Sequence, residues 1–146
     1  MLTQEDANIL LEILKEIKDT QDGFILPSGN ECKKIEAVSY DQRHSFIIDV
    51  NRKGKINSVK FTLQNRYAGS VILLRLDIGG PPHRNPDGKT ICGNHIHIYR
   101  EGYDTRFAEV IPKEFVNPSN MLSTLYDFLV YCKVTNTDSI DIQSGL

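Results

Sequence analysis

The residues best suited to chemistry are crowded into one run, residues 75–100, which holds three of the chain's four histidines. Histidine has an unperturbed pKa near 6.5, so both of its protonation states are accessible at neutral pH. Neighbouring arginines could stabilise developing negative charge. If the protein has a chemical site, we expect it in this run.

Two strand-like segments border the run and predict which side chains share a face. Residues 71–78 (VILLRLDI) and 95–99 (HIHIY) both alternate apolar and polar side chains. If they are antiparallel neighbours, one face is apolar, and the other places its side chains on a grid of about 5 Å. That polar face would carry Arg75, Asp77, His95, His97 and Tyr99.

The connection between these strands, residues 79–94 (GGPPHRNPDGKTICGN), could fold over the polar face. It would add His83, Arg84, Asn85 and Asp87 to the site. A polar loop of this length in a small domain is more often functional than idle. Its glycines and prolines also suit a plain turn that keeps the chain compact.

Metal-free phosphodiester transfer fits this set of residues best. One histidine would deprotonate a ribose 2′-hydroxyl and a second would protonate the leaving oxygen, while arginine stabilises the transition state. We predict His95, His97, Arg75 and Arg84 as the catalytic group, with no metal or other cofactor. The predicted substrate-binding residues are Asp77, His83, Asn85, Tyr99 and Arg100.

Two other interpretations stay open. The two histidines of HIHIY, with Asp77, His83 or Glu101, could bind zinc, iron or manganese. The stretch from Gly88 to Glu101 resembles the first cupin motif, but its spacing from Gly88 is one residue too long and no histidine follows downstream. Alternatively, the polar face could be a non-catalytic surface that binds a protein or a nucleotide.

The remaining pattern predicts an α+β fold in one domain, residues 1–146. Apolar residues at helical spacing predict an N-terminal helix over 4–19, and Ser119 is the predicted N-cap of a second helix. Strands are expected at 33–40, 44–50, 56–63, 71–78, 95–99 and 106–111. We therefore expect an antiparallel sheet of five or six strands with both helices packed on one face.

Composition narrows the class of protein. The net charge of −2 argues against a general nucleic-acid coat, and three cysteines without CxxC spacing argue against a disulfide framework or a structural zinc site. No signal peptide or membrane-length apolar run is present in the sequence. We expect a cytoplasmic protein with RNA or a host or antitoxin protein as partner, and no membrane contact.

The strings LLRLDIGGPPHRNPDG, HIHIYREGYD and TLYDFLVYC, within residues 73–146, resemble a family of small uncharacterised proteins from bacteria, phages and prophage-like elements. The resemblance implies a role in conflict between host and mobile element. Within that role, we favour a ribonuclease toxin that is paired with an antitoxin. The alternative is a non-catalytic, phage-encoded anti-defence protein resembling a CRISPR inhibitor.

Overall fold

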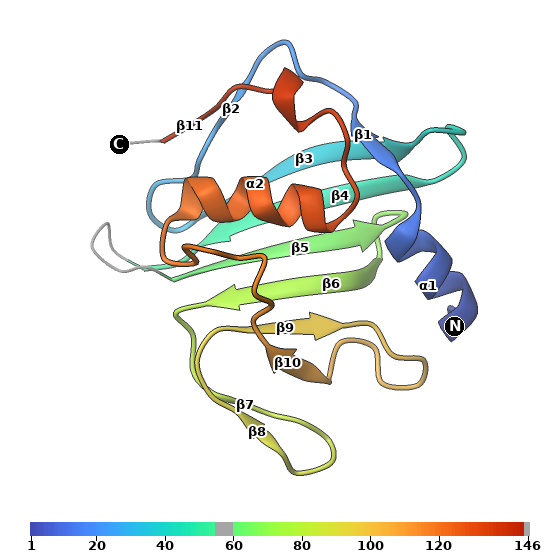
Figure 1. Ribbon diagram of the computed structural model, residues 1–146, viewed down its shortest axis with the longest axis vertical. Helices are drawn as coiled ribbons and strands as arrows, with labels where there is room; N and C mark the ends of the chain where they lie inside the picture. Colours follow the sequence, from blue (N-terminus) through green and yellow to red (C-terminus); the bar gives the residue numbers. More distant parts are fainter. Residues whose placement is uncertain (55–59, 145–146) are drawn as a thin grey trace.

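The centre of the protein is an antiparallel sheet of seven strands, seen in a computed structural model that describes residues 1–54 and 60–144. Their order across the sheet is β1-β3-β4-β5-β6-β9-β10 (Figure 1). Long alternating segments form the middle of the sheet and short ones its two edges. The strands are β1 (Lys15–Ile17), β3 (Glu31–Ser39), β4 (Ser45–Arg52), β5 (Phe61–Tyr67), β6 (Val71–Ile78), β9 (His95–Ile98) and β10 (Ala108–Val110).

Two small sheets flank the main one. Strand β2 (Phe24–Ile25) pairs in parallel with β11 (Ile142–Gln143), close to the C-terminal end of the described chain. Strands β7 (His83–Arg84) and β8 (Thr90–Ile91) form a hairpin that extends below β9 and β10 in Figure 1. This hairpin lies within the 79–94 connection singled out from the sequence.

Helix α2 (Met121–Tyr131) lies across one face of the sheet (Figure 1). Its buried residues Leu125, Phe128 and Leu129 pack on the apolar side chains of the strands beneath it. The cap of this helix corrects the prediction of Ser119: Asn120 is the N-cap, and its side chain accepts a hydrogen bond from the backbone N–H of Ser123 at 2.9 Å. The helix therefore starts one residue later than expected.

The predicted N-terminal helix over 4–19 is too long. Helix α1 (Gln4–Glu12) is capped by Thr3, but the chain turns extended at Ile13 and residues 15–17 form edge strand β1. The backbone N–H of Lys15 donates to the carbonyl of Lys133, and β1 pairs with β3. Hydrogen bonding to distant segments therefore outweighs the local helical periodicity.

Packing of the helices also differs from the prediction of one shared face. Helix α1 lies at one end of the sheet, where Ala7 and Leu10 join a small separate cluster with Phe46, Leu73 and Tyr99 (Figure 1). The α+β class with two helices and a large antiparallel sheet is confirmed. The sheet has seven strands rather than five or six, because the edge strand β1 was not expected.

Individual strands match the predictions to different degrees. Residues 71–78 form β6 as predicted, whereas the predicted strand 106–111 is shortened to Ala108–Val110. Of the predicted strand 56–63, residues 56–59 lie outside the described residues, and β5 runs on to Tyr67. In the described chain, no helix is long and apolar enough to cross a membrane.

The sheet face opposite α2 is polar. Cross-strand register aligns Asp49, Gln64, Arg75 and His97 in one row from β4 to β9. A neighbouring row runs through Asn51, Thr62, Asp77 and His95. The polar face predicted from alternation is therefore one end of a wider polar surface, and the hairpin lies beside that end.

Candidate functional site

Strands β6 and β9 position the core of the candidate site. They are antiparallel neighbours, with Arg75 opposite His97 and Asp77 opposite His95, while Leu76 pairs with Ile96 on the apolar face. Because side chains alternate along each strand, the four polar residues project from the same face. This register is the one that alternation predicts.

The hairpin brings the third histidine to this face. The ring of His83 lies 4.6 Å from that of His97 and 5.8 Å from that of His95, measured between centroids. Its Nε2 donates to the carbonyl of Arg106 at 2.8 Å. The buried amide of Asn85 exchanges two hydrogen bonds with the backbone of Ala108, at 2.8 and 3.0 Å, and so fastens the hairpin to β10.

Asp77 is the electrostatic centre of the cluster. Burial opposes ionisation of its carboxyl group, but the contacts with His97 and Arg75 outweigh that effect and hold the pKa of Asp77 well below its ordinary value. Arg75 donates to both carboxylate oxygens, at 2.9 and 3.1 Å, and the hydroxyl of Thr62 donates to Oδ1 at 3.0 Å. The carboxylate is thus ionised and fixed in orientation.

Both ring nitrogens of His95 and of His97 are engaged by the protein. The Nδ1 atoms lie 2.9 Å from the carbonyl oxygen of Gly93 and 2.8 Å from that of Thr105, respectively. The Nε2 atoms lie 3.3 and 3.2 Å from Oδ2 of Asp77. With exposed fractions of only 2% and 4%, these two rings are less available for proton transfer than the sequence suggests.

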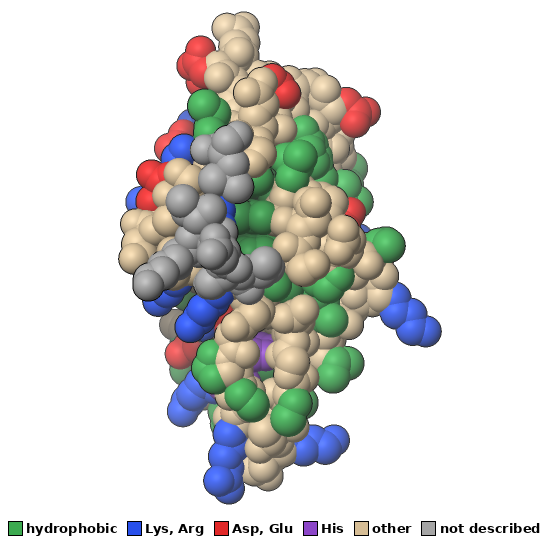
Figure 2. Space-filling view, turned by 90° about the vertical axis from the view of Figure 1, so that its left-hand side faces the viewer, with side chains coloured by type: hydrophobic (Ala, Val, Ile, Leu, Met, Phe, Trp, Pro, Cys, Tyr) green, Lys and Arg blue, Asp and Glu red, His purple; other side chains and the backbone are tan. Residues whose placement is uncertain are grey.

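A cavity of about 360 Å³ opens onto the cluster. Its wall includes the loop residues Gly80, Pro81 and Pro82, together with Thr105 and Arg106 from the segment that precedes β10. Figure 2 shows histidine surface through an opening in the lower part of the molecule, with lysine and arginine side chains gathered around that end. The lining of the cavity combines two arginines, Arg75 and Arg106, with one carboxylate, that of Asp77.

The cavity brings together five of the predicted site residues, namely Arg75, Asp77, His83, His95 and His97. Four others lie elsewhere. Arg84 is exposed on the hairpin and does not line the cavity, and Asn85 is a buried anchor. Tyr99 turns toward α1 and donates from its hydroxyl to the carbonyl of Leu2, while Arg100 stacks over the ring of Phe107 at 3.7 Å.

Sequence reasoning missed two contributors to the site. Arg106 lines the cavity and supplies the carbonyl that holds His83, and Thr105 supplies the carbonyl that holds His97. Both follow the turn after β9 and lie in no strand. Both residues act through main-chain carbonyls, which every residue type has, so their identity does not reveal these contacts. The arginine at the start of the predicted strand 106–111 is the one feature of the sequence that could have indicated a site residue here.

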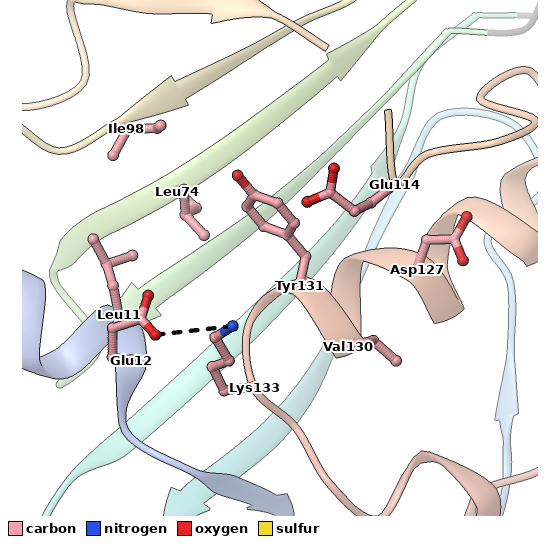
Figure 3. Close-up of a pocket in the computed structure, with 9 residues that line it drawn as sticks. All are labelled: Leu11, Glu12, Leu74, Ile98, Glu114, Asp127, Val130, Tyr131 and Lys133. Atoms are coloured by element: carbon pink, nitrogen blue, oxygen red, sulfur yellow. Dashed lines mark ion pairs between the residues drawn. The ribbon is translucent and has the colours of Figure 1, made fainter. Parts of the chain in front are cut away.

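A second hollow, of about 510 Å³, lies on the α2 side of the sheet. Figure 3 shows Leu74 and Tyr131 between the ion pair of Glu12 with Lys133, at 3.9 Å, and the carboxylate of Glu114. Glu114 makes no ion pair within the described part of the chain. This groove has an apolar floor and an acidic rim, and it carries no histidine.

Comparison with known proteins gives one match. A model for a family of unknown function, DUF6978, matches residues 2–134. The chain belongs to this family. The matched DUF6978 region includes every residue of the histidine cavity. No curated protein and no solved structure matches the chain.

Proposed function

We propose that this DUF6978 protein is a ribonuclease that cleaves RNA in the histidine cavity. The observation that carries the proposal is the grouping of three imidazole rings, the carboxylate of Asp77 and the residues Arg75 and Arg106 around one cavity. Imidazole can transfer protons at neutral pH, and guanidinium groups stabilise charge on a phosphoryl transition state.

His83 is the best placed proton acceptor. A carbonyl oxygen only accepts hydrogen bonds, so the Nε2 of His83 that contacts Arg106 carries the proton and the Nδ1 keeps its lone pair. No hydrogen bond to this Nδ1 occurs among residues 1–54 and 60–144. The ring is half-buried and lines the cavity, so it could deprotonate a 2′-hydroxyl there.

Roles for the other residues follow from their contacts. Arg75, whose side chain is 43% exposed, would bind the phosphate. The guanidinium of Arg106 donates to the carbonyls of Gly102 and Tyr103, so it would have to leave that turn to assist. The sequence assigns proton transfer to His95 and His97 without a metal, and that mechanism stays a prediction. It requires one of these rings to release Asp77 before it can protonate the leaving oxygen.

Cleavage of a fluorescent single-stranded RNA by purified protein tests this proposal. Wild-type protein should yield 2′,3′-cyclic phosphate ends and leave the matching DNA intact, because DNA lacks the nucleophilic hydroxyl. His83→Ala should lower the rate by about 10²- to 10⁴-fold. The control His44→Ala removes a histidine that contacts Tyr67 outside the cavity and should cleave normally.

The biological setting that we propose is conflict between a bacterium and a mobile element. Expression of the wild-type chain in a bacterial host should then arrest growth, and His83→Ala should relieve the arrest. Absence of cleavage by wild-type protein, or equal cleavage by His83→Ala and wild type, contradicts the ribonuclease proposal.

The acidic groove beside α2 supports a second candidate, a non-catalytic anti-defence protein. Its occupant would be a host protein that inserts a lysine or arginine next to an apolar side chain, because the floor is apolar and the carboxylates of Glu114 and Asp127 line the groove. Protection of a phage from a bacterial defence system should then be lost in Glu114→Lys and kept in His83→Ala. The opposite pattern counts against this candidate.

A further inference from the structure

We propose that Asp77, His95 and His97 form a binding site for one divalent transition-metal ion. The site lies within the cavity of the proposed ribonuclease, but the inference goes beyond that function, because an ion would bind whether or not RNA is the substrate. With an ion bound, His95 and His97 would be ligands and not proton donors, so the metal-free mechanism above would apply only to the ion-free protein. It rests on the geometry of three side chains and on the hydrogen bonds that orient them.

Two of the three separations among the ligand atoms are suited to a shared metal. One ligand atom from each residue lies within 4.8 Å of the others. The two Nε2 atoms are 3.3 and 3.2 Å from Oδ2 of Asp77. Tetrahedral ligands at about 2.0 to 2.1 Å from a zinc ion are separated by about 3.3 Å, so these two distances match edges of a coordination polyhedron.

Both histidines are oriented as metal ligands are. Metal-binding histidine usually donates its second ring N–H to a carbonyl or carboxylate, which fixes the tautomer and turns the other nitrogen toward the metal. Here the Nδ1 atoms face the backbone carbonyls of Gly93 and Thr105, so both carry a proton. In a neutral ring the lone pair is then on Nε2, facing Asp77 Oδ2.

Without a cation between them, these atoms are poorly matched. With Nδ1 donating to a carbonyl, each neutral imidazole turns a lone pair toward Oδ2 of Asp77, and two hydrogen-bond acceptors do not stabilise one another. Both Nε2 atoms could donate hydrogen bonds to Asp77 only if both rings were cationic. Two buried imidazolium groups and Arg75 would then surround one carboxylate. One divalent ion satisfies all three ligand atoms together.

The surroundings suit a metal with an open coordination position. Arg75 and Thr62 hold the carboxylate, as supporting hydrogen bonds do for metal-binding carboxylates. Three protein ligands leave a position for water or a phosphate oxygen, which is the arrangement of catalytic rather than structural zinc. Two imidazoles favour zinc, iron or nickel over magnesium, which prefers oxygen ligands.

Metal titration of purified, chelator-treated protein tests the site. The exposed thiols of Cys32 and Cys92 could also bind zinc, so the reference protein carries Cys32→Ser and Cys92→Ser. Calorimetric titration with zinc chloride should show one ion per chain. Asp77→Asn and His97→Gln in the same background should bind at least about 100-fold more weakly, and His44→Gln should bind as the reference does.

A second measurement leaves the site unmutated, in case a variant does not fold. The imidazole ¹⁵N resonances of His95 and His97 should shift on addition of zinc, while those of His44 should not. Failure of the reference protein to bind stoichiometric zinc overturns the inference. So does binding that survives in both folded variants, or unmoved His95 and His97 resonances.

Failure of this inference can be told apart from failure of the proposed function. Zinc binding at these residues without RNA cleavage supports the metal site and contradicts the ribonuclease proposal. Cleavage that persists in excess chelator, together with no zinc binding, supports the metal-free ribonuclease and overturns the metal site.

Discussion

Lys15 makes the stability of this protein depend on pH in a way that can be measured. Its side chain is fully buried, and Nζ donates to the carbonyls of Ile13 and Cys132, both at 2.9 Å. The ammonium also lies 4.6 Å from the ring centroid of Phe46. Burial nevertheless lowers the pKa of Lys15 from 10.5 to about 8, because desolvation of the charge outweighs its favourable neighbours.

The sign of the effect follows from proton binding. Between pH 8 and 10.5 the unfolded chain keeps the proton of this lysine while the folded chain has released it, so the free energy of unfolding rises with pH. One unit of pKa shift corresponds to about 1.4 kcal/mol, so the free energy of unfolding should rise by about 3 kcal/mol across this pH range. Below pH 8 both states are protonated and the contribution is constant.

Urea unfolding followed by circular dichroism at pH 7 to 10 measures this contribution. Cys132 acts in the opposite direction, because burial raises the pKa of its thiol to about 12, so each Lys15→Met value is subtracted from wild type at the same pH. The difference should grow in favour of wild type by roughly 1 to 3 kcal/mol above pH 8. Lys18→Met, which removes an exposed lysine, is the control. Parallel curves for wild type and Lys15→Met would refute the reasoning.

Two further predictions concern the core around α2. Asn120→Ala should lower the free energy of unfolding by about 1 kcal/mol, because it removes the cap hydrogen bond with the backbone of Ser123. The control Ser119→Ala should change the free energy of unfolding little. Equal effects of the two substitutions in denaturant titrations would contradict the assignment of Asn120 as the N-cap. Asn65 is fully buried, and its amide has no hydrogen-bond partner in the described chain beyond a weak contact with the thiol of Cys132. Asn65→Leu should therefore raise the melting temperature, with a gain of about 1 to 3 kcal/mol, and a lower melting temperature would show that the amide is satisfied in solution.

The central part of the site was predictable because its signals are local. Alternation along residues 71–78 and 95–98 separates Arg75, Asp77 and the two strand histidines from the apolar side chains. Period two is a property of any strand, so the shared face followed once the two segments were taken as neighbours. Helical periodicity located α2 for the same reason.

Prediction failed where a distant segment decides the local structure. The helical pattern continues past Glu12, yet Lys15 pairs with the segment after α2 and the helix ends. The alternation of residues 95–99 predicts Tyr99 on the polar face. In the structure β9 ends at Ile98, and the hydroxyl of Tyr99 contacts Leu2 near the N-terminus. Propensity carries no information about such partners.

The sequence by itself determined the α+β class and the polar face that bears Arg75, Asp77, His95 and His97. Only the tertiary structure decided what those residues contact. Backbone carbonyls at Gly93 and Thr105 and the carboxylate of Asp77 contact the nitrogens of His95 and His97. His83 lines the cavity, and its Nδ1 makes no hydrogen bond with the described residues. Main-chain carbonyls are common to all residue types, so the availability of each histidine nitrogen depends on the folded path of the chain.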